Sequence, residues 1–174
     1  MKLIHPQITW EEIPKQQDVI MHPVESNYRK VLMAEWAIFW LIVLTVAVAC
    51  AYFIDALHSS NILLLIGTGY VLLAVFHYIS IRKAFPLLAY AVREHDVLLR
   101  KGWLFRQIHV VPINRIQHCV IKKGPLERRY QLASLQLFTA ATSFTDIKIG
   151  GLTEEQAERL KEWVLAKQVV HEQH

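Results

Sequence analysis

WAIFWLIVLTVAVACAYFI (Trp36–Ile54) and ILLLIGTGYVLLAVFHYISI (Ile62–Ile81) are two uncharged apolar runs that decide the fold of this chain. Each run is close to the roughly 20 apolar residues that a helix needs to cross a hydrocarbon core. Only Asp55–Asn61 joins them, so the two helices must lie antiparallel and adjacent. Two soluble core helices could also be apolar all round, but a chain of 174 residues is too short to surround both. The sequence therefore predicts a transmembrane hairpin within residues 31–85, with spans at about 36–54 and 62–81.

The basic residues beside the two runs predict the orientation of the hairpin. Arg29 and Lys30 precede the first run, Arg82 and Lys83 follow the second, and the connector has no Lys or Arg. Because positive charge near the membrane ends stays cytoplasmic, we expect both termini inside and the connector outside. Residues 1–30 have no apolar signal-peptide core and contain three prolines, which predicts an irregular cytoplasmic lead-in and an uncleaved first span.

The hydrophobic period changes after Pro86 and predicts a β-rich domain over residues 87–168, followed by a tail at 169–174. Several short stretches alternate or are bounded by turn residues, which is typical of an antiparallel sheet or barrel. We expect six strands: Leu88–Val92, Val97–Trp103, Ile108–Pro112, Ile116–Lys122, Leu135–Thr139 and Thr145–Ile149. Gly150–Gly151 is expected to end the sheet. A capping-box spacing from Thr153 to Gln156 then predicts an amphipathic helix, about Glu154–Gln168, over one open end of the sheet.

The charge of the chain is unevenly distributed. The formal net charge is +4, but residues 82–150 alone hold twelve basic and four acidic residues, a net +8. At the cytoplasmic leaflet such a surface favours anionic lipid head groups over nucleic acid. The candidate binding residues are cations of the turn around Gly124–Pro125 and of the membrane flank: Lys122, Lys123, Arg128, Arg129, Arg82 and Lys83. The alternative is that one arginine pairs with Glu127 or caps a backbone carbonyl and the remaining cations are only solvated.

No pattern in the sequence indicates an enzyme. The nucleophile-elbow, P-loop and zinc-protease motifs are absent, and no Cys or His spacing suggests a metal site. His118 and Cys119 are adjacent in a predicted strand, where successive side chains face opposite sides, so they do not form a reactive pair. We expect a non-enzymatic protein without a metal or other cofactor.

Several stretches, in order, resemble the bacterial pleckstrin-homology (PH) domain family of small membrane proteins. They are Leu98–Trp103, Val111–Gln117, Lys123–Leu135 and Leu137–Ala140. The resemblance implies a membrane α-helical hairpin followed by a β-rich PH-like domain, a bent antiparallel barrel or sandwich of seven strands with a C-terminal capping helix. The sequence departs from the family at Gln131 and Ala141, where glycine is usual and commonly adopts positive φ.

The resemblance also implies a location and a class of function. Such proteins are multi-pass proteins of the bacterial inner membrane, and PH-like domains bind phosphoinositides in some lineages and proteins in others. We expect an accessory protein that binds anionic lipid, a partner membrane protein, or both, with a larger relative carrying repeated PH-like domains as one such partner. A dedicated lipid sensor and a scaffold subunit of a larger complex for envelope stress or transport remain alternatives. Gly67–Thr68–Gly69 would permit close helix approach in a homo-oligomer.

Overall fold

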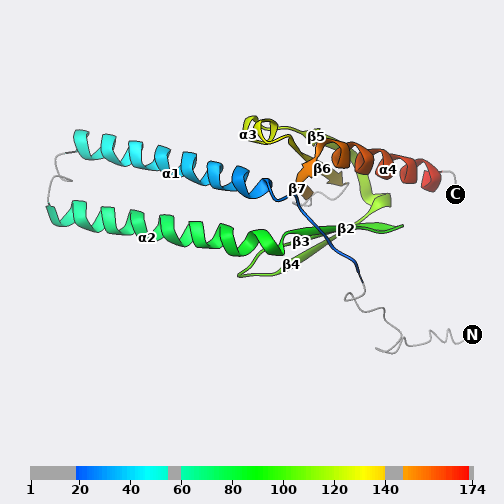
Figure 1. Ribbon diagram of the computed structural model, residues 1–174, viewed down its shortest axis with the longest axis horizontal. Coiled ribbons are helices and arrows are strands. Elements are labelled where there is room, and N and C mark those ends of the chain that lie inside the picture. Colours follow the sequence, from blue (N-terminus) through cyan, green and yellow to red (C-terminus); the bar gives the residue numbers. More distant parts are fainter. Residues whose placement is uncertain (1–18, 55–59, 140–146, 173–174) are drawn as a thin grey trace, which may run out of the picture.

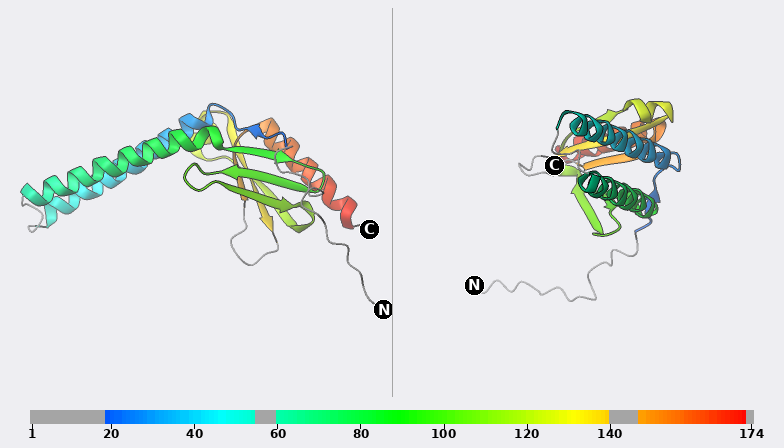
Figure 2. Two further views of the ribbon diagram at one scale, coloured as in Figure 1. Left: turned by 90° about the horizontal axis from the view of Figure 1, so that it is seen from below. Right: turned by 90° about the vertical axis from the view of Figure 1, so that its left-hand side faces the viewer.

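The computed structural model describes residues 19–54, 60–139 and 147–172. Most of the predicted outward connector lies outside these residues, as do Ala141 and the last two residues of the tail. The described chain forms a long helical hairpin that projects from one end of a small β domain (Figures 1 and 2).

The hairpin consists of α1 (Tyr28–Phe53) and α2 (Ser60–Ala84), which extend beyond the apolar runs at the ends nearest the β domain. Both helices are long and apolar enough to cross a membrane, and only 11% and 6% of their most apolar windows are buried inside the molecule. Most side chains of the two apolar runs therefore face outward, and most of these are apolar, as a lipid environment requires. A short helical turn, η3 (Phe85–Leu87), follows α2 and leads into the β domain.

Two antiparallel sheets form the β domain, in agreement with the predicted PH-like architecture. The first sheet has the order β1 (His22–Pro23), β2 (Ala89–Val92), β3 (Asp96–Lys101) and β4 (Gln107–Pro112). The second has β5 (Ile116–Lys122), β6 (Leu132–Thr139) and β7 (Ile147–Thr153). The turn η4 (Ile113–Arg115) joins the sheets, and α3 (Pro125–Arg129) joins β5 to β6.

The core lies between the two sheets and under the C-terminal helix. Ile113, Leu135 and Ile149 are completely enclosed there. The helix α4 (Glu154–Glu172) packs on β5, β6, β7 and η4, and its Ala157 and Val164 belong to the same core. The predicted capping box is confirmed: the amide of Gln156 donates to Thr153 Oγ1 at 3.1 Å, and the amide of Thr153 donates to Gln156 Oε1 at 2.9 Å.

The seventh strand comes from before the hairpin, in a segment for which the sequence predicts no regular structure. In β1, His22 pairs with Tyr90 and Pro23 pairs with Ala89, so the whole hairpin is the connection between β1 and β2. Proline is tolerated because β1 is an edge strand. A further bond, from the amide of Glu25 to the carbonyl of Gly151 at 2.9 Å, attaches this segment to the second sheet. The description of residues 1–30 as an irregular lead-in is thus wrong for His22–Pro23 and for Tyr28–Lys30, which begin α1, whereas residues 1–18 lie outside the described residues.

Gly150 and Gly151 do not end the sheet as expected, because β7 continues through both to Thr153. Their missing side chains leave the space that the Tyr28 ring of α1 occupies, and a Cβ at either position would overlap that ring. Gly151 also has φ +73°, a conformation that glycine adopts without strain. The two glycines therefore seat the base of the hairpin on β7.

Candidate functional site

The short helix α3 lies where the β domain meets the membrane hairpin. Gly124 precedes it and Pro125 is its first residue, an arrangement that suits a helix start because proline lacks only an amide that would be unpaired there. Its residues contact α1, and the Lys30 ammonium near the start of α1 lies 6.0 Å from the centre of the Tyr130 ring. The basic turn is thereby held beside the end of α1 that is nearest the β domain (Figure 1).

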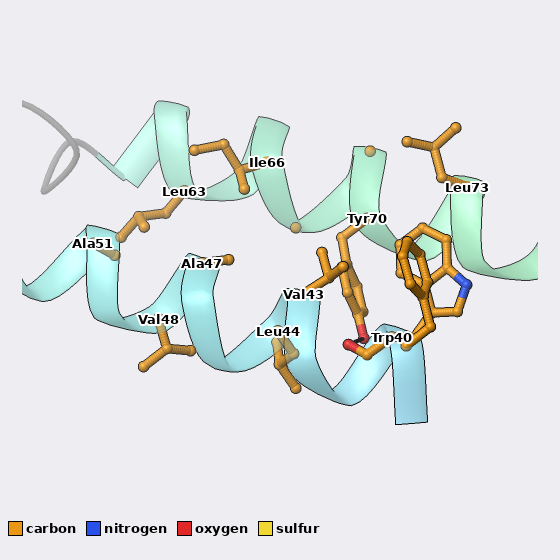
Figure 3. A pocket seen from close by; sticks show the side chains of 13 residues that line it. Trp40, Val43, Leu44, Ala47, Val48, Ala51, Leu63, Ile66, Tyr70 and Leu73 are labelled. Atoms are coloured by element: carbon orange, nitrogen blue, oxygen red, sulfur yellow. Dashed lines mark hydrogen bonds between the residues drawn. The ribbon is translucent and has the colours of Figure 1, made fainter. Parts of the chain in front are cut away.

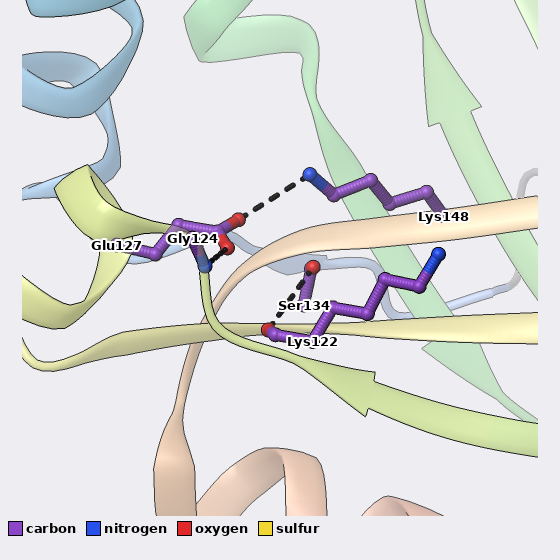
Figure 4. Close-up of polar contacts among 5 residues, drawn as sticks. All are labelled: Lys122, Gly124, Glu127, Ser134 and Lys148. Carbon is purple, nitrogen blue, oxygen red and sulfur yellow. Dashed lines mark hydrogen bonds and ion pairs between the residues drawn. The ribbon is translucent and has the colours of Figure 1, made fainter.

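Glu127 is the buried anchor of this turn. Its carboxylate accepts a bond from the Gly124 amide at 2.8 Å and pairs with Lys148 Nζ of β7 at 3.4 Å (Figure 4). The residue is only 5% exposed, so its charge must be compensated locally. The partner is Lys148 and not an arginine of the turn, which contradicts the pairing considered from the sequence. Arg128 and Arg129 therefore keep their charge available.

The structure divides the six candidate cations into three groups. Lys122, Arg128 and Arg129 are exposed, and none has an ion pair within the described parts of the chain. Lys123 instead pairs with Glu154 at the start of α4. On the second span, Arg82 lies 5.9 Å from the Tyr78 ring centre and Lys83 lies 5.1 Å from that of Trp103. Lys122, Arg128 and Arg129, which lie in α3 or just before it, are called the α3 cations below.

A cleft of about 340 Å³ separates α3 from α1. Its lining includes the charged residues Glu35, Glu127 and Lys148 and the apolar residues Ile38, Pro125 and Leu126. Glu35 is exposed at the level of Trp36, whose ring meets the ring of Tyr78 on α2 at a centroid distance of 5.6 Å. Since aromatic rings collect at membrane interfaces, this pair is expected at the edge of the hydrocarbon layer nearest the β domain.

Within the hairpin, a few polar groups hold the two helices together. Trp40 Nε1 donates to His77 Nδ1 at 3.2 Å, and the Tyr70 hydroxyl donates to the Trp40 carbonyl at 2.9 Å. Beyond this pair the helices enclose an apolar cleft of about 570 Å³ (Figure 3). Gly67 and Gly69 line it, but a Cβ on either glycine would meet no atom within 4 Å. These glycines are thus not needed for packing inside the hairpin.

The groups capable of catalysis do not converge in the described structure. The His118 ring stacks on Phe138 at 4.3 Å between centroids, on the exposed side of β5, whereas Cys119 is buried. Burial raises the pKa of the Cys119 thiol, although nearby Lys161 lowers it, so the reactive thiolate is disfavoured. Among the described residues no group of three His, Cys, Asp or Glu side chains is placed to hold a metal ion.

An exposed apolar turn was not singled out from the sequence. The expected strand to Trp103 ends at Lys101, and Gly102, with φ +90°, starts a turn that leads to β4. Leu104 and Phe105 on this turn are 62% and 76% exposed. The available signal was three successive apolar residues, Trp103–Phe105, directly after a glycine and between Lys101 and Arg106.

Comparison with known proteins agrees with this architecture. The family described as Bacterial PH domain matches residues 37–168. The chain is 32% identical over 126 residues to the UPF0699 transmembrane protein YdbS of Bacillus subtilis (strain 168), covering 72% of this chain and 76% of that protein. No solved structure matches the chain. The second span and most of the β domain lie inside the matched region, whereas β1 lies before it.

Proposed function

Because this chain belongs to the bacterial PH domain family, we propose that it is a non-enzymatic accessory protein of the bacterial inner membrane whose β domain binds anionic lipid head groups. The observation that carries the proposal is the set of α3 cations. Lys122, Arg128 and Arg129 are exposed and have no ion pair within the described residues. Arg128 and Arg129 belong to α3, which contacts the first span, and Lys122 ends the strand β5 just before it.

The chemistry of these cations suits a phosphate ligand. A guanidinium group offers a planar pair of donors that matches two phosphate oxygens, and charge-assisted bonds of this kind are stronger than neutral ones. A cation near an anionic leaflet contributes about 1 kcal/mol to membrane attraction. Three such cations would therefore bias the lipid composition around the protein without requiring a deep binding pocket.

The proposal includes an orientation. Arg29, Lys30, Arg82 and Lys83 lie at the β-domain ends of the two spans, which favours a cytoplasmic β domain and cytoplasmic termini. The cytoplasmic leaflet of the membrane is the one that presents anionic lipids to a basic surface in the cytoplasm.

Retention of lipid by the full-length protein tests the proposal. We would purify the protein in mild detergent with equal phosphatidylglycerol and phosphatidylcholine, and count the lipids retained by native mass spectrometry. The wild type should prefer phosphatidylglycerol, and the variant K122Q/R128Q/R129Q should lose at least half of that preference. The matched control R93Q/R159Q/K161Q removes three cations elsewhere in the domain and should retain the preference.

Two results would refute lipid binding by the α3 cations. One is a wild type without preference for phosphatidylglycerol, and the other is an unchanged preference in K122Q/R128Q/R129Q. Raising the salt concentration should weaken the wild-type preference, because the Debye length falls from about 10 Å at 0.1 M to about 3 Å at 1 M.

A second candidate function is the binding of a partner membrane protein, such as a larger relative with repeated PH-like domains or a second copy of this chain. The specific observation in its favour is the apolar cleft of the hairpin, where Gly67 and Gly69 leave helix backbone uncovered. Replacing both glycines with leucine should abolish any co-purifying complex seen by native mass measurement. A wild-type monomer that purifies alone from mild detergent would contradict this function.

A further inference from the structure

The turn between β3 and β4 lies beside the point where the chain leaves the membrane. In the register of the first sheet, Arg100 at the end of β3 pairs with Ala89 at the start of β2. Arg100 Nε also donates to the Leu87 carbonyl in η3 at 3.1 Å. The residues that follow β3 are thus fixed next to the end of α2. Figures 1 and 2 both show this turn reaching back along the last part of α2, toward the membrane end of the molecule.

The conformation of the turn directs its apolar side chains outward. Gly102 has φ +90°, and a Cβ there would overlap the Phe105 carbonyl, so the tight turn needs glycine. Leu104 and Phe105 are the most exposed large apolar residues of the β domain, at 62% and 76%. Two adjacent apolar side chains presented to water are unfavourable unless another apolar phase covers them.

The position of Trp103 identifies that phase as the bilayer interface. The Lys83 ammonium lies 5.1 Å from the Trp103 ring centre, which places the turn level with the last turn of α2. Tyr78, whose ring meets that of Trp36, is five residues before Lys83 on α2. This corresponds to roughly 7 Å along the helix axis, about the thickness of one head-group layer. The exposed Lys101 and Arg106 flank the apolar residues and match the phosphates of that layer.

From these observations we propose that Trp103, Leu104 and Phe105 form a membrane-interface wedge, which inserts into the head-group layer of the same bilayer that the hairpin crosses. This wedge lies beside α2, whereas α3 lies beside α1, so the β domain has a lipid contact on each side of the hairpin (Figure 1). The wedge is apolar and needs no anionic lipid. It therefore goes beyond the proposed recognition of lipid head groups and can be separated from it experimentally.

A spin label on the full-length protein tests the wedge directly. In a C50A/C119A background, a nitroxide would be attached at F105C and, as the matched control, at E94C in the turn between β2 and β3 at the opposite end of the first sheet. Each protein would be reconstituted in vesicles of pure phosphatidylcholine and in vesicles with 30% phosphatidylglycerol. Collision with oxygen, which concentrates in the bilayer, would be compared with collision with a water-soluble nickel complex.

We expect the label at position 105 to be protected from nickel at least fivefold relative to the label at position 94, in both kinds of vesicle. Adding L104D to the F105C protein should restore nickel access, whereas L104I should not. Equal nickel access at positions 105 and 94 would overturn the wedge. Protection only in vesicles with phosphatidylglycerol would also overturn it, because charge and not apolar insertion would then hold the turn. These outcomes do not depend on whether K122Q/R128Q/R129Q loses the preference for phosphatidylglycerol, so the wedge and the proposed lipid binding can fail separately.

Discussion

At the scale of single residues, Glu127 connects the fold to the basic turn. Its carboxylate holds the start of α3 through the Gly124 amide and neutralises Lys148. We expect E127A to destabilise the β domain by about 2 kcal/mol, since a buried bond to a charged group is lost. E127Q should cost less because its amide oxygen can still accept from Gly124. Thermal unfolding in detergent, followed by near-ultraviolet circular dichroism, would measure both, and equal stability of E127A and wild type would contradict this role.

His109 gives a second prediction at this scale. Its Nε2 is buried and has no hydrogen-bond partner among the described residues, and burial, followed by the charge of Lys101, lowers the pKa of the ring. The unfolded chain then takes up the proton first, at a pKa near 6.5, so stability falls as the pH drops through that value toward the folded pKa. H109L should lose less thermal stability between pH 7.5 and pH 5.5 than the wild type. The exposed-site control H118Q should behave like the wild type, and identical losses in all three proteins would refute the prediction.

Residue types could be predicted from the sequence here, but their partners could not. The sequence shows that Lys122, Arg128 and Arg129 cluster, but the pairing of Glu127 with Lys148 depends on a contact between α3 and β7, which are separated along the chain. Gln131 illustrates the same limit. It adopts φ +55°, the region for which glycine is suited, so the backbone keeps the turn although the residue type differs from that of the family.

At the scale of elements, the packing of Tyr28 on β7 couples the first span to the β domain. G150A should destabilise the protein because the new methyl group would overlap the Tyr28 ring. In a double-mutant cycle, Y28A should relieve much of the cost of G150A, with a coupling energy of about 1 kcal/mol or more. It should relieve less of the cost of G151A, since the φ of +73° there strains any other residue. Strict additivity of Y28A and G150A would show that the two elements are not coupled in this way.

The elements with strong periodicity were predictable, and those defined by tertiary contact were not. Both spans and the capped helix α4 follow from apolar pattern and capping residues alone. The strand β1 has only two residues, one of them proline, and so has no period to detect. The continuation of β7 through two glycines depends on the Tyr28 ring, which the local sequence does not reveal.

At the scale of the whole molecule, the orientation in the membrane is the main prediction. A cytoplasm-active reporter fused after His174 should be active, and the same reporter inserted between α1 and α2 should be inactive. Exchanging Arg82 and Lys83 for glutamine, and adding two lysines to the connector, should reduce the activity of the C-terminal fusion. An active reporter in the connector would reverse the assignment of the α3 cations to the inner leaflet.

The order of the chain shows that the basic turn belongs to the domain attached to the hairpin, but not that this turn lies at the hairpin end of the domain. The order of the chain also does not show that one proposed lipid contact lies beside α1 and the other beside α2. The contact of α3 with α1 and that of Trp103 with Lys83 depend on how the two sheets are joined to the spans. The sequence treats Trp103 as the end of a strand, whereas the structure makes it the start of an exposed turn.

The insertion of the hairpin between β1 and β2 has a consequence for biosynthesis. The ribosome delivers His22–Pro23 before either span, but their partners Tyr90 and Ala89 emerge only after both spans have been made. The first sheet can therefore form completely only after both helices of the hairpin have been synthesised. We expect that a polypeptide with only one helix inserted would leave His22–Pro23 and Tyr90 on opposite sides of the membrane, so that β1 could not pair with β2.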